Sequence, residues 1–289
     1  MQEAPLIEPF IERLHYNLKR QNIYAPIPPI NNTIDLDFLL NRSISLIQNV
    51  VWNCLPRYTD PIGLDLLHDI YENTEYLDIA TLNHDLLVEN FLDSKQIEYC
   101  GGFGKQEGDV RYFQSELYDK GNKTNLFKLH GSINWYRFRS TKDGNTIDKY
   151  GMAVGRDHWH LKDENGHFVT NLDGYPLFLT GSNNKMLDYN FGIYRILHAK
   201  FDRSLKRKRI MVMSGYGWND RGINGRLFEW LGSSINNRLI LLHENPDDLK
   251  KYSRSALWHR YDDLISDGRL IPITKWFLEV KFSDIEEYF

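Results

Sequence analysis

Cysteine is scarce in this sequence, with only Cys54 and Cys100 among 289 residues. Two thiols are too few for a disulfide framework, and they exclude a zinc module built from four cysteines. Long apolar runs are also missing, because stretches such as residues 239–242 fall far short of the roughly 20 residues that span a bilayer. Residues 1–20 lack a signal-peptide pattern, since charged residues interrupt their apolar positions. We therefore predict a cytoplasmic protein without a membrane segment.

A large excess of charge is absent as well. The formal net charge of −4 gives no overall attraction to nucleic acid or to an anionic membrane. The basic run at residues 206–209 closes a predicted helix, where cations interact favourably with the helix dipole. Nucleic acid and membrane are therefore not expected as partners.

Glycine is almost absent from the N-terminal part, where Gly63 is the only one in the first eighty residues. No glycine-rich phosphate-binding turn can therefore be built there. Apolar residues at helical spacing instead predict helices at about residues 5–21, 34–55 and 61–73, and three prolines at residues 25–29 predict a loop between the first two.

Short apolar strands that end in polar clusters are what the sequence does contain. Because ligands bind at the carboxyl ends of strands in open α/β sheets, an Asn, an Asp and a His arriving there together form a site for acid–base chemistry on a small molecule. The alternative is that Asn83 and Asp85 cap the next helix and that His130 opens a turn. The four clusters are residues 81–85 (TLNHD), 128–135 (KLHGSINW), 214–220 (SGYGWND) and 241–246 (LLHENP).

The middle of the chain departs from this alternation of predicted strands and helices. Residues 101–124 are polar and glycine-rich and predict a loop, whereas the alternation over 132–138 predicts a strand or hairpin arm. The alternation of strands and helices resumes with a predicted strand at 176–181 and a helix at about 187–205. Residues 140–173 predict an inserted loop or lid. Its donors could form a metal site, although a solvated loop is favoured: His158, His160, His167, Asp157 and Asp163.

The combination and order of the four polar clusters resembles the sirtuin superfamily, and more closely the bacterial sirtuin-like domains that consume NAD in antiphage defence. The likeness covers about residues 34–246. It implies an α/β fold: a Rossmann-like three-layer domain with a mostly parallel sheet, a helical N-terminal region and an inserted lobe. The expected divisions are an N-terminal helix and loop at 1–33, the sirtuin-like domain at 34–139 and 174–289, and the insertion at 140–173.

The resemblance also implies roles for individual residues, with NAD as the substrate. The first sirtuin motif, Thr-Gln-Asn-Ile-Asp, corresponds to Thr81 through Asp85, so Asn83 and Asp85 are expected around the nicotinamide ribose. His130, followed by Gly131, is expected to be the general base. This set suits the chemistry, because cleaving the nicotinamide bond builds positive charge on the ribose and needs nearby oxygens and a base. The residues expected at the adenine nucleoside are Gly215, Tyr216, Gly217, Asn219, Asp220 and Asn245.

Two departures from the family qualify these expectations. The four-cysteine zinc module of the protein deacylases is missing, which argues against that activity and predicts no zinc. The family also opens with a strand ending in a Gly-Ala-Gly-x-Ser turn, and nothing before Thr81 matches it. That strand would lie in the middle of the sheet, beside the strand leading to Thr81. It is either encoded upstream, lost from a domain that has rebuilt its sheet, or donated by another subunit.

The leading hypothesis is an NAD glycohydrolase. The alternative is a catalytically degenerate domain that binds NAD or ADP-ribose as a sensor, or that serves as an interaction module. A homo-oligomer or a partner protein that completes or regulates the domain would fit either hypothesis.

Overall fold

A computed structural model describes residues 46–55, 59–142, 145–155, 158–179, 185–252 and 256–289. The predicted helix at 5–21 and the proline-rich loop lie outside these residues. Residues 46–54 are helical, so the end of the helix predicted at 34–55 is present.

Two parallel strands carry the first two polar clusters. β1 (Leu77–Thr81) pairs with β4 (Thr124–Lys128) in a register that sets Thr81 opposite Lys128. Because the strands run in the same direction, their polar ends emerge at the same edge. The helices α3 (Asp65–Asn73) and α4 (Leu87–Ser94) precede and follow β1. The prediction that α3 starts at Pro61 was wrong, because Gly63 turns the chain there with a φ of +82°.

A second parallel sheet carries the other two polar clusters. β8 (Ile210–Ser214), β9 (Arg238–Leu242) and β10 (Leu270–Ile273) are arranged in the order β10-β9-β8. Four consecutive leucine and isoleucine side chains of β9 are buried, as expected for a central strand. The surrounding elements are α6 (Gly192–Leu205), α7 (Arg221–Ser233), α8 (Pro246–Tyr252), α9 (Ala256–Ser266), η3 (Phe277–Glu279), η4 (Phe282–Asp284) and η5 (Glu286–Tyr288).

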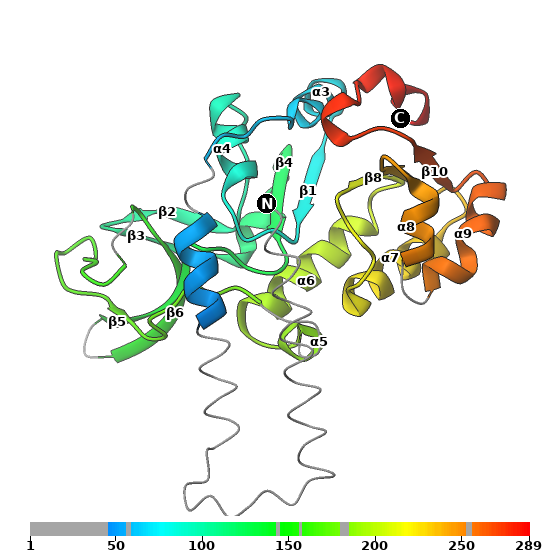
Figure 1. Ribbon diagram of the computed structural model, residues 1–289. Helices are drawn as coiled ribbons and strands as arrows, with labels where there is room; N and C mark the ends of the chain where they lie inside the picture. The colour runs from blue at the N-terminus through cyan, green and yellow to red at the C-terminus, as the bar shows by residue number, and fades with distance from the viewer. Residues whose placement is uncertain (1–45, 56–58, 143–144, 156–157, 180–184, 253–255) are drawn as a thin grey trace, which may run out of the picture.

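The two parallel sheets are not hydrogen-bonded to each other within the described residues. β1 pairs only with β4, and β8 pairs only with β9. Figure 1 shows β4, β1 and β8 following one another across the molecule, so β1 and β8 form the inner edges of the two sheets. One apolar cluster contains both Leu77 of β1 and Val212 of β8. These open edges lie where the resemblance places the strand that the sequence lacks.

A five-stranded antiparallel sheet forms a separate lobe, seen beside the parallel strands in Figure 1. The loop predicted for residues 101–124 was wrong, because these residues contain a β-hairpin and a 3-10 helix. Val110 and Tyr112 of the hairpin are buried against Phe138, which a solvated loop would leave exposed. The strand order is β2-β3-β6-β5-β7. The elements are β2 (Phe103–Glu107), β3 (Val110–Phe113), η2 (Ser115–Asp119), β5 (Trp135–Lys142), β6 (Asn145–Ala153) and β7 (Thr170–Asn171).

The segment predicted as an inserted loop also contributes to this lobe. β6 and β7 lie within residues 140–173 and pair with β5. His158, expected in a solvated loop, is 3% exposed and stacks on Tyr136, with the ring centroids 4.8 Å apart. His160 is exposed. Within the described residues, no group of three or more His, Cys, Asp or Glu side chains could hold a metal ion.

Two further predictions near the lobe need correction. The strand predicted at 176–181 is not formed over its described part, where Phe178 makes only an isolated bridge to Gly131. The helix predicted at 187–205 is divided into α5 (Lys185–Asp188) and α6. The division occurs at Gly192, whose φ of +53° is incompatible with a continuous helix.

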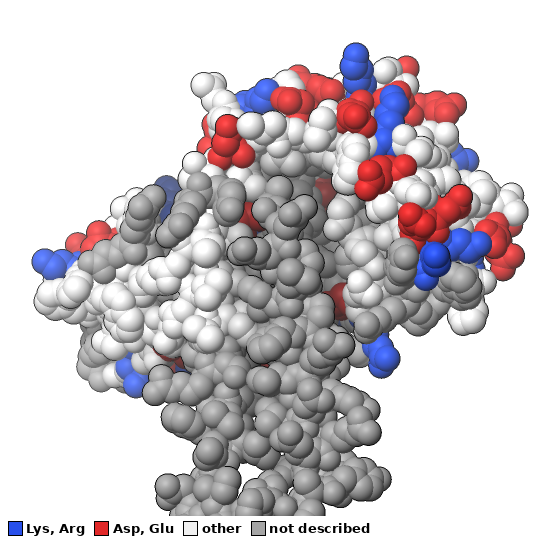
Figure 2. All heavy atoms as spheres, in the orientation of Figure 1, with Lys and Arg blue, Asp and Glu red and all other residues white. Residues whose placement is uncertain are grey.

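The described residues give no sign of a membrane span, and the face of the molecule in Figure 2 carries charges of both signs. Among the described helices, none combines the length and apolar character needed to cross a bilayer. Acidic and basic side chains are interspersed over the coloured part of the face shown in Figure 2.

Candidate functional site

Backbone hydrogen bonds join the polar ends of β1 and β4. The Leu129 amide donates to the Thr81 carbonyl over 3.0 Å, and the Ile133 amide donates to the His84 carbonyl over 3.0 Å. The predicted motifs at 81–85 and 128–135 are therefore neighbours in space, although 45 residues separate Asp85 from His130 in the chain.

Asn83 and Asp85 occupy different environments within the first motif. Asn83 is exposed, and its backbone amide donates to the Thr81 hydroxyl over 3.1 Å. The Asp85 Oδ1 atom accepts a hydrogen bond from the Leu87 amide over 3.1 Å at the start of α4. Asp85 thus has the capping role that the sequence analysis kept as an alternative, whereas Asn83 is exposed to solvent.

Gly131 allows the second motif to turn closely against a neighbouring loop. Its φ is +84°, and a side chain at this position would collide with the carbonyl oxygen of Leu177. The backbone amide of Ser132 donates to the same carbonyl over 3.0 Å. Only glycine satisfies both the backbone conformation and this approach.

His130 is 4% exposed and belongs to a hydrogen-bonded network. Its Nε2 atom lies 2.7 Å from the Tyr189 hydroxyl and 3.2 Å from Asp220 Oδ2. The Tyr189 hydroxyl donates to the same Asp220 oxygen over 2.5 Å. Burial on its own raises the pKa of Asp220, but hydrogen bonds from His130, Tyr189 and the Ile223 amide outweigh it and hold that pKa well below its usual value. Asp220 is therefore an anion beside an imidazole.

Two other histidines lie near His130. Among the described residues, neither of them is hydrogen-bonded to a carboxylate. The ring centroid of His84 lies 6.2 Å from that of His130, and the ring of His198 lies 4.0 Å from that of Tyr189. Burial, followed by the charge of His130, lowers the pKa of His84 to about 3. Burial, followed by the charge of Arg226, lowers the pKa of His198 to about 3. Both imidazoles are neutral near pH 7, whereas His130 is the member of this group that is hydrogen-bonded to a carboxylate.

The third motif supplies Asp220 and an exposed loop. Asp220 is the N-cap of α7, where its Oδ1 atom accepts hydrogen bonds from Gly222 and Ile223. Gly215, Gly217 and Asn219 are exposed on the same loop. The Tyr216 hydroxyl instead donates to the Asn224 side chain over 2.6 Å. Of the residues expected at the adenine nucleoside, Asp220 is thus the one in contact with the histidine.

The fourth motif ends in a helix cap. The Asn245 Oδ1 atom accepts from the Asp248 amide over 3.1 Å, and its Nδ2 donates to the Asp248 carboxylate over 2.9 Å. Asn245 is exposed and lies just after β9, so its side chain both caps α8 and faces solvent.

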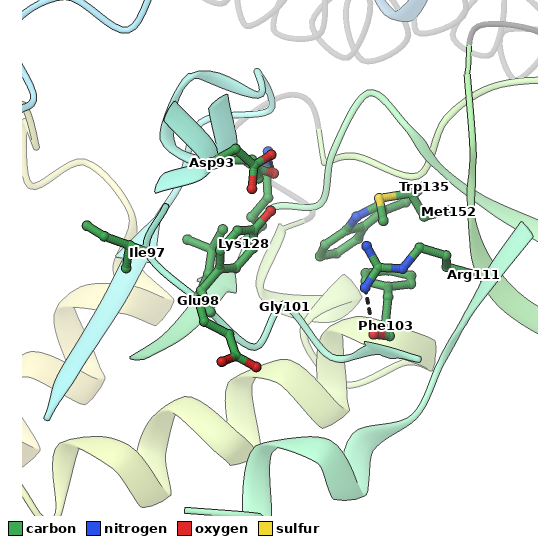
Figure 3. A pocket seen from close by; sticks show the side chains of 12 residues that line it. Asp93, Ile97, Glu98, Gly101, Phe103, Arg111, Lys128, Trp135 and Met152 are labelled. Atoms are coloured by element: carbon green, nitrogen blue, oxygen red, sulfur yellow. Dashed lines mark hydrogen bonds and ion pairs between the residues drawn. The ribbon is translucent and has the colours of Figure 1, made fainter. Parts of the chain in front are cut away.

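A cavity of about 290 Å³ lies under α4, beside the buried Lys128 (Figure 3). Lys128 is 2% exposed, and its ammonium group lies 2.8 Å from the Glu89 carboxylate. It also donates to the carbonyl of Asp85, which ties the end of β4 to the first motif. The side chains of Arg111 and Trp135 line the same cavity from the antiparallel lobe. None of the predicted site residues lines this cavity, which is therefore separate from the His130 network.

Sequence reasoning missed Tyr189, which completes that network. It lies between α5 and α6 in a segment where the sequence predicts an uninterrupted helix. Nothing in its local sequence distinguishes it from the other tyrosines, of which the chain has seventeen in all. Its role comes from tertiary packing against α7.

Comparison with known proteins identifies the family. No curated protein matches the chain. The family model described as "SIR2-like domain" matches residues 78–262, which include β1, β4, β8 and β9 together with His130 and Asp220. The match covers more than half of the 289 residues. The chain therefore belongs to the family of SIR2-like domains.

Proposed function

We propose that this SIR2-like domain is an NAD glycohydrolase that cleaves the nicotinamide glycosidic bond, and that it acts in antiphage defence. The observation that supports the proposal is the meeting of two motifs: the motif that contains the exposed Asn83 brings the His84 ring within 6.2 Å of the His130 ring, and His130 is hydrogen-bonded to a carboxylate. A Rossmann-like arrangement, with the parallel strands β1, β4, β8 and β9 all ending in polar loops, supports binding of a dinucleotide at this edge.

The reaction breaks the bond between ribose C1′ and the nicotinamide nitrogen, whose electron pair leaves with nicotinamide. Water then adds to C1′, and the overall products are nicotinamide, ADP-ribose and a proton. His130 would take the proton from the attacking water or from a ribose hydroxyl, and Asp220 would stabilise the resulting imidazolium. Oxygen atoms of Asn83 and Asp85 would face the positive charge that develops on the ribose.

The exposed loop after β8 would contact the adenosine half of the substrate. Gly215 and Gly217 are exposed, and Asn219 adds a side-chain donor and acceptor. Asn245 after β9 would extend this contact. Thr81 would shape the nicotinamide end through the hydrogen bond that its carbonyl accepts from the Leu129 amide, and Gly131 through the turn that follows β4.

The direct test of this function is incubation of the purified protein with NAD while nicotinamide release is followed. The wild type should release nicotinamide, and His130→Ala should lose activity by about 10²- to 10⁴-fold, as expected for removal of a general base. His160→Ala is a matched control, because His160 is exposed on the antiparallel lobe. Activity that survives loss of His130 would contradict the mechanism. Protection of cells against phage that disappears with the same variant would support the defence role.

A second candidate is a domain that binds NAD or ADP-ribose without turnover, as a sensor or an interaction module. The inner edges of β1 and β8, which no described strand pairs with, favour it, because a sheet that lacked its central strand would hold the substrate less firmly. Calorimetry separates the candidates. A sensor binds NAD or ADP-ribose with no nicotinamide released, and a purely structural domain binds neither. Light scattering of the same sample would show whether the protein forms a homo-oligomer.

A further inference from the structure

Two contacts of the His130 Nε2 atom determine whether this nitrogen carries a hydrogen. Asp220 is ionised, so its Oδ2 atom can only accept hydrogen bonds. The Tyr189 hydroxyl gives its single proton to that oxygen over 2.5 Å and can therefore only accept from His130. Both neighbours of His130 Nε2 are thus acceptors, at 2.7 and 3.2 Å. Nε2 must carry a hydrogen, and in the neutral ring the lone pair is on Nδ1.

The surrounding fold holds Asp220 in the orientation that this arrangement requires. Its Oδ1 atom is occupied by the amides of Gly222 and Ile223 at 2.9 and 3.0 Å, which leaves Oδ2 for His130 and Tyr189. Gly222 is also needed for the approach of Tyr189, because a Cβ atom there would lie 2.5 Å from a carbon of the Tyr189 ring. The N-cap of α7 positions Asp220, and Gly222 makes room for Tyr189. Together they hold both groups that contact the His130 ring.

We propose that Asp220 and Tyr189 are positioning residues that fix the Nε2–H tautomer of His130 and present Nδ1 as its basic nitrogen. The catalytic consequence rests on the proposed function, whereas the tautomer itself is a property of the protein alone. Asp220 is thereby assigned to the histidine, although the family resemblance implied a contact with the adenine nucleoside.

Nitrogen-15 NMR of the labelled protein without substrate tests the tautomer. The ring nitrogen shifts distinguish Nε2–H from Nδ1–H, and the spectrum of His130→Gln assigns the signals. We expect Nε2–H in the wild type. In Asp220→Asn the amide can donate to Nε2, so the ring should change to Nδ1–H and the pKa of His130 should fall by about 1 to 3 pH units. The other titratable groups around the site, whose charges must be followed in the same experiment, are His84, His198, Lys128, Lys185, Tyr189 and Arg226.

Asp284→Asn is the matched control. Asp284 also accepts a hydrogen bond from a backbone amide, that of Lys281 at 2.9 Å, but it lies in the C-terminal 3-10 turns. It should leave the His130 signals unchanged. An Nδ1–H ring in the wild type, or a His130 pKa that Asp220→Asn does not alter, would overturn the proposal. Thermal melting of each variant shows that the fold is retained.

The rate of nicotinamide release is the second measurement. Asp220→Asn should reduce nicotinamide release by about 10³- to 10⁴-fold, as expected when a base is held in the wrong tautomer. Tyr189→Phe should reduce it less, because Asp220 still accepts from Nε2. A wild type with the Nε2–H tautomer but no nicotinamide release would refute the proposed function and leave the positioning role intact. Equal activity of Asp220→Asn and wild type would refute the positioning role in catalysis.

Discussion

At the scale of residues, three imidazoles lie around one candidate site in two environments. Burial holds His84 and His198 neutral near pH 7, whereas His130 is hydrogen-bonded to a carboxylate. Such differences in environment are how neighbouring groups of one kind acquire different roles.

The two neutral histidines predict sensitivity of the fold to acid. Their folded pKa values of about 3 lie below the ordinary 6.5, so the unfolded chain binds more protons between these limits. Their stabilising effect is complete above pH 6.5 and is lost progressively as the pH falls toward 3. The free energy of unfolding should decrease by up to about 1.4 kcal/mol per pH unit for each histidine in this window. Urea unfolding between pH 7 and 5 measures the slope, which the double variant His84→Gln, His198→Gln should reduce. An unchanged slope would show that neither histidine is responsible.

The site could be predicted from the sequence where a motif follows a strand, and not where packing joins distant segments. Asn83 and His130 were identified because each follows a short apolar strand, and parallel strands place their ends together. The proximity of Asp220 to His130 depends on how the N-terminus of α7 meets the turn after β4, which residue spacing does not reveal. Tyr189 depends in addition on Gly222, whose missing side chain makes room for its ring.

At the scale of elements, the turn after β4 depends on Gly131, and its replacement should be costly. Gly131→Ala forces a side chain into a φ of +84° and against the Leu177 carbonyl. The left-handed conformation costs about 1 to 2 kcal/mol and the overpacking about 1 to 3 kcal/mol. Gly121→Ala is the matched control, because its φ is +70° but nothing lies within 4 Å of an added Cβ. Chemical denaturation should show a larger loss for Gly131→Ala, and equal losses would exclude the clash with Leu177.

The parallel strands were predicted more successfully than the antiparallel lobe. β8 and β9 contain continuous apolar runs, β1 and β4 contain shorter ones, and all four are followed by polar turns, a pattern that local sequence carries. The hairpin at 103–113 was read as a loop because its glycines and charged residues dominate the composition. Its strands are stabilised by burial of Val110 and Tyr112 against Phe138 of a distant strand. At residues 176–179 an apolar run packs against Gly131 without entering a ladder.

At the scale of the whole molecule, the parallel strands that the structure describes form two sheets that share their apolar surroundings but not their hydrogen bonds. One cluster joins Leu77 to Val212, and the Asp78 carboxylate on β1 accepts from Ser204 at the end of α6 over 2.5 Å. β9 lies between two neighbours and is buried, whereas every residue of β8 is at least partly exposed. Between the described strands of the two sheets, side chains thus supply the contacts.

Among the described strands, β8 pairs on one side only, and this has a consequence for the exchange of its amide hydrogens with solvent. In a parallel strand the N–H groups point alternately to the two sides, so every second amide of β8 faces β9 and the others face the opening. Exchange followed by NMR should therefore alternate between slow and fast along residues 210–214, while the paired amides of β9 all exchange slowly. Uniformly slow exchange along β8 would mean that another segment pairs with its inner edge. The alternation of exchange rates along residues 210–214 would thus distinguish a sheet that has been rebuilt without its central strand from one that another segment completes.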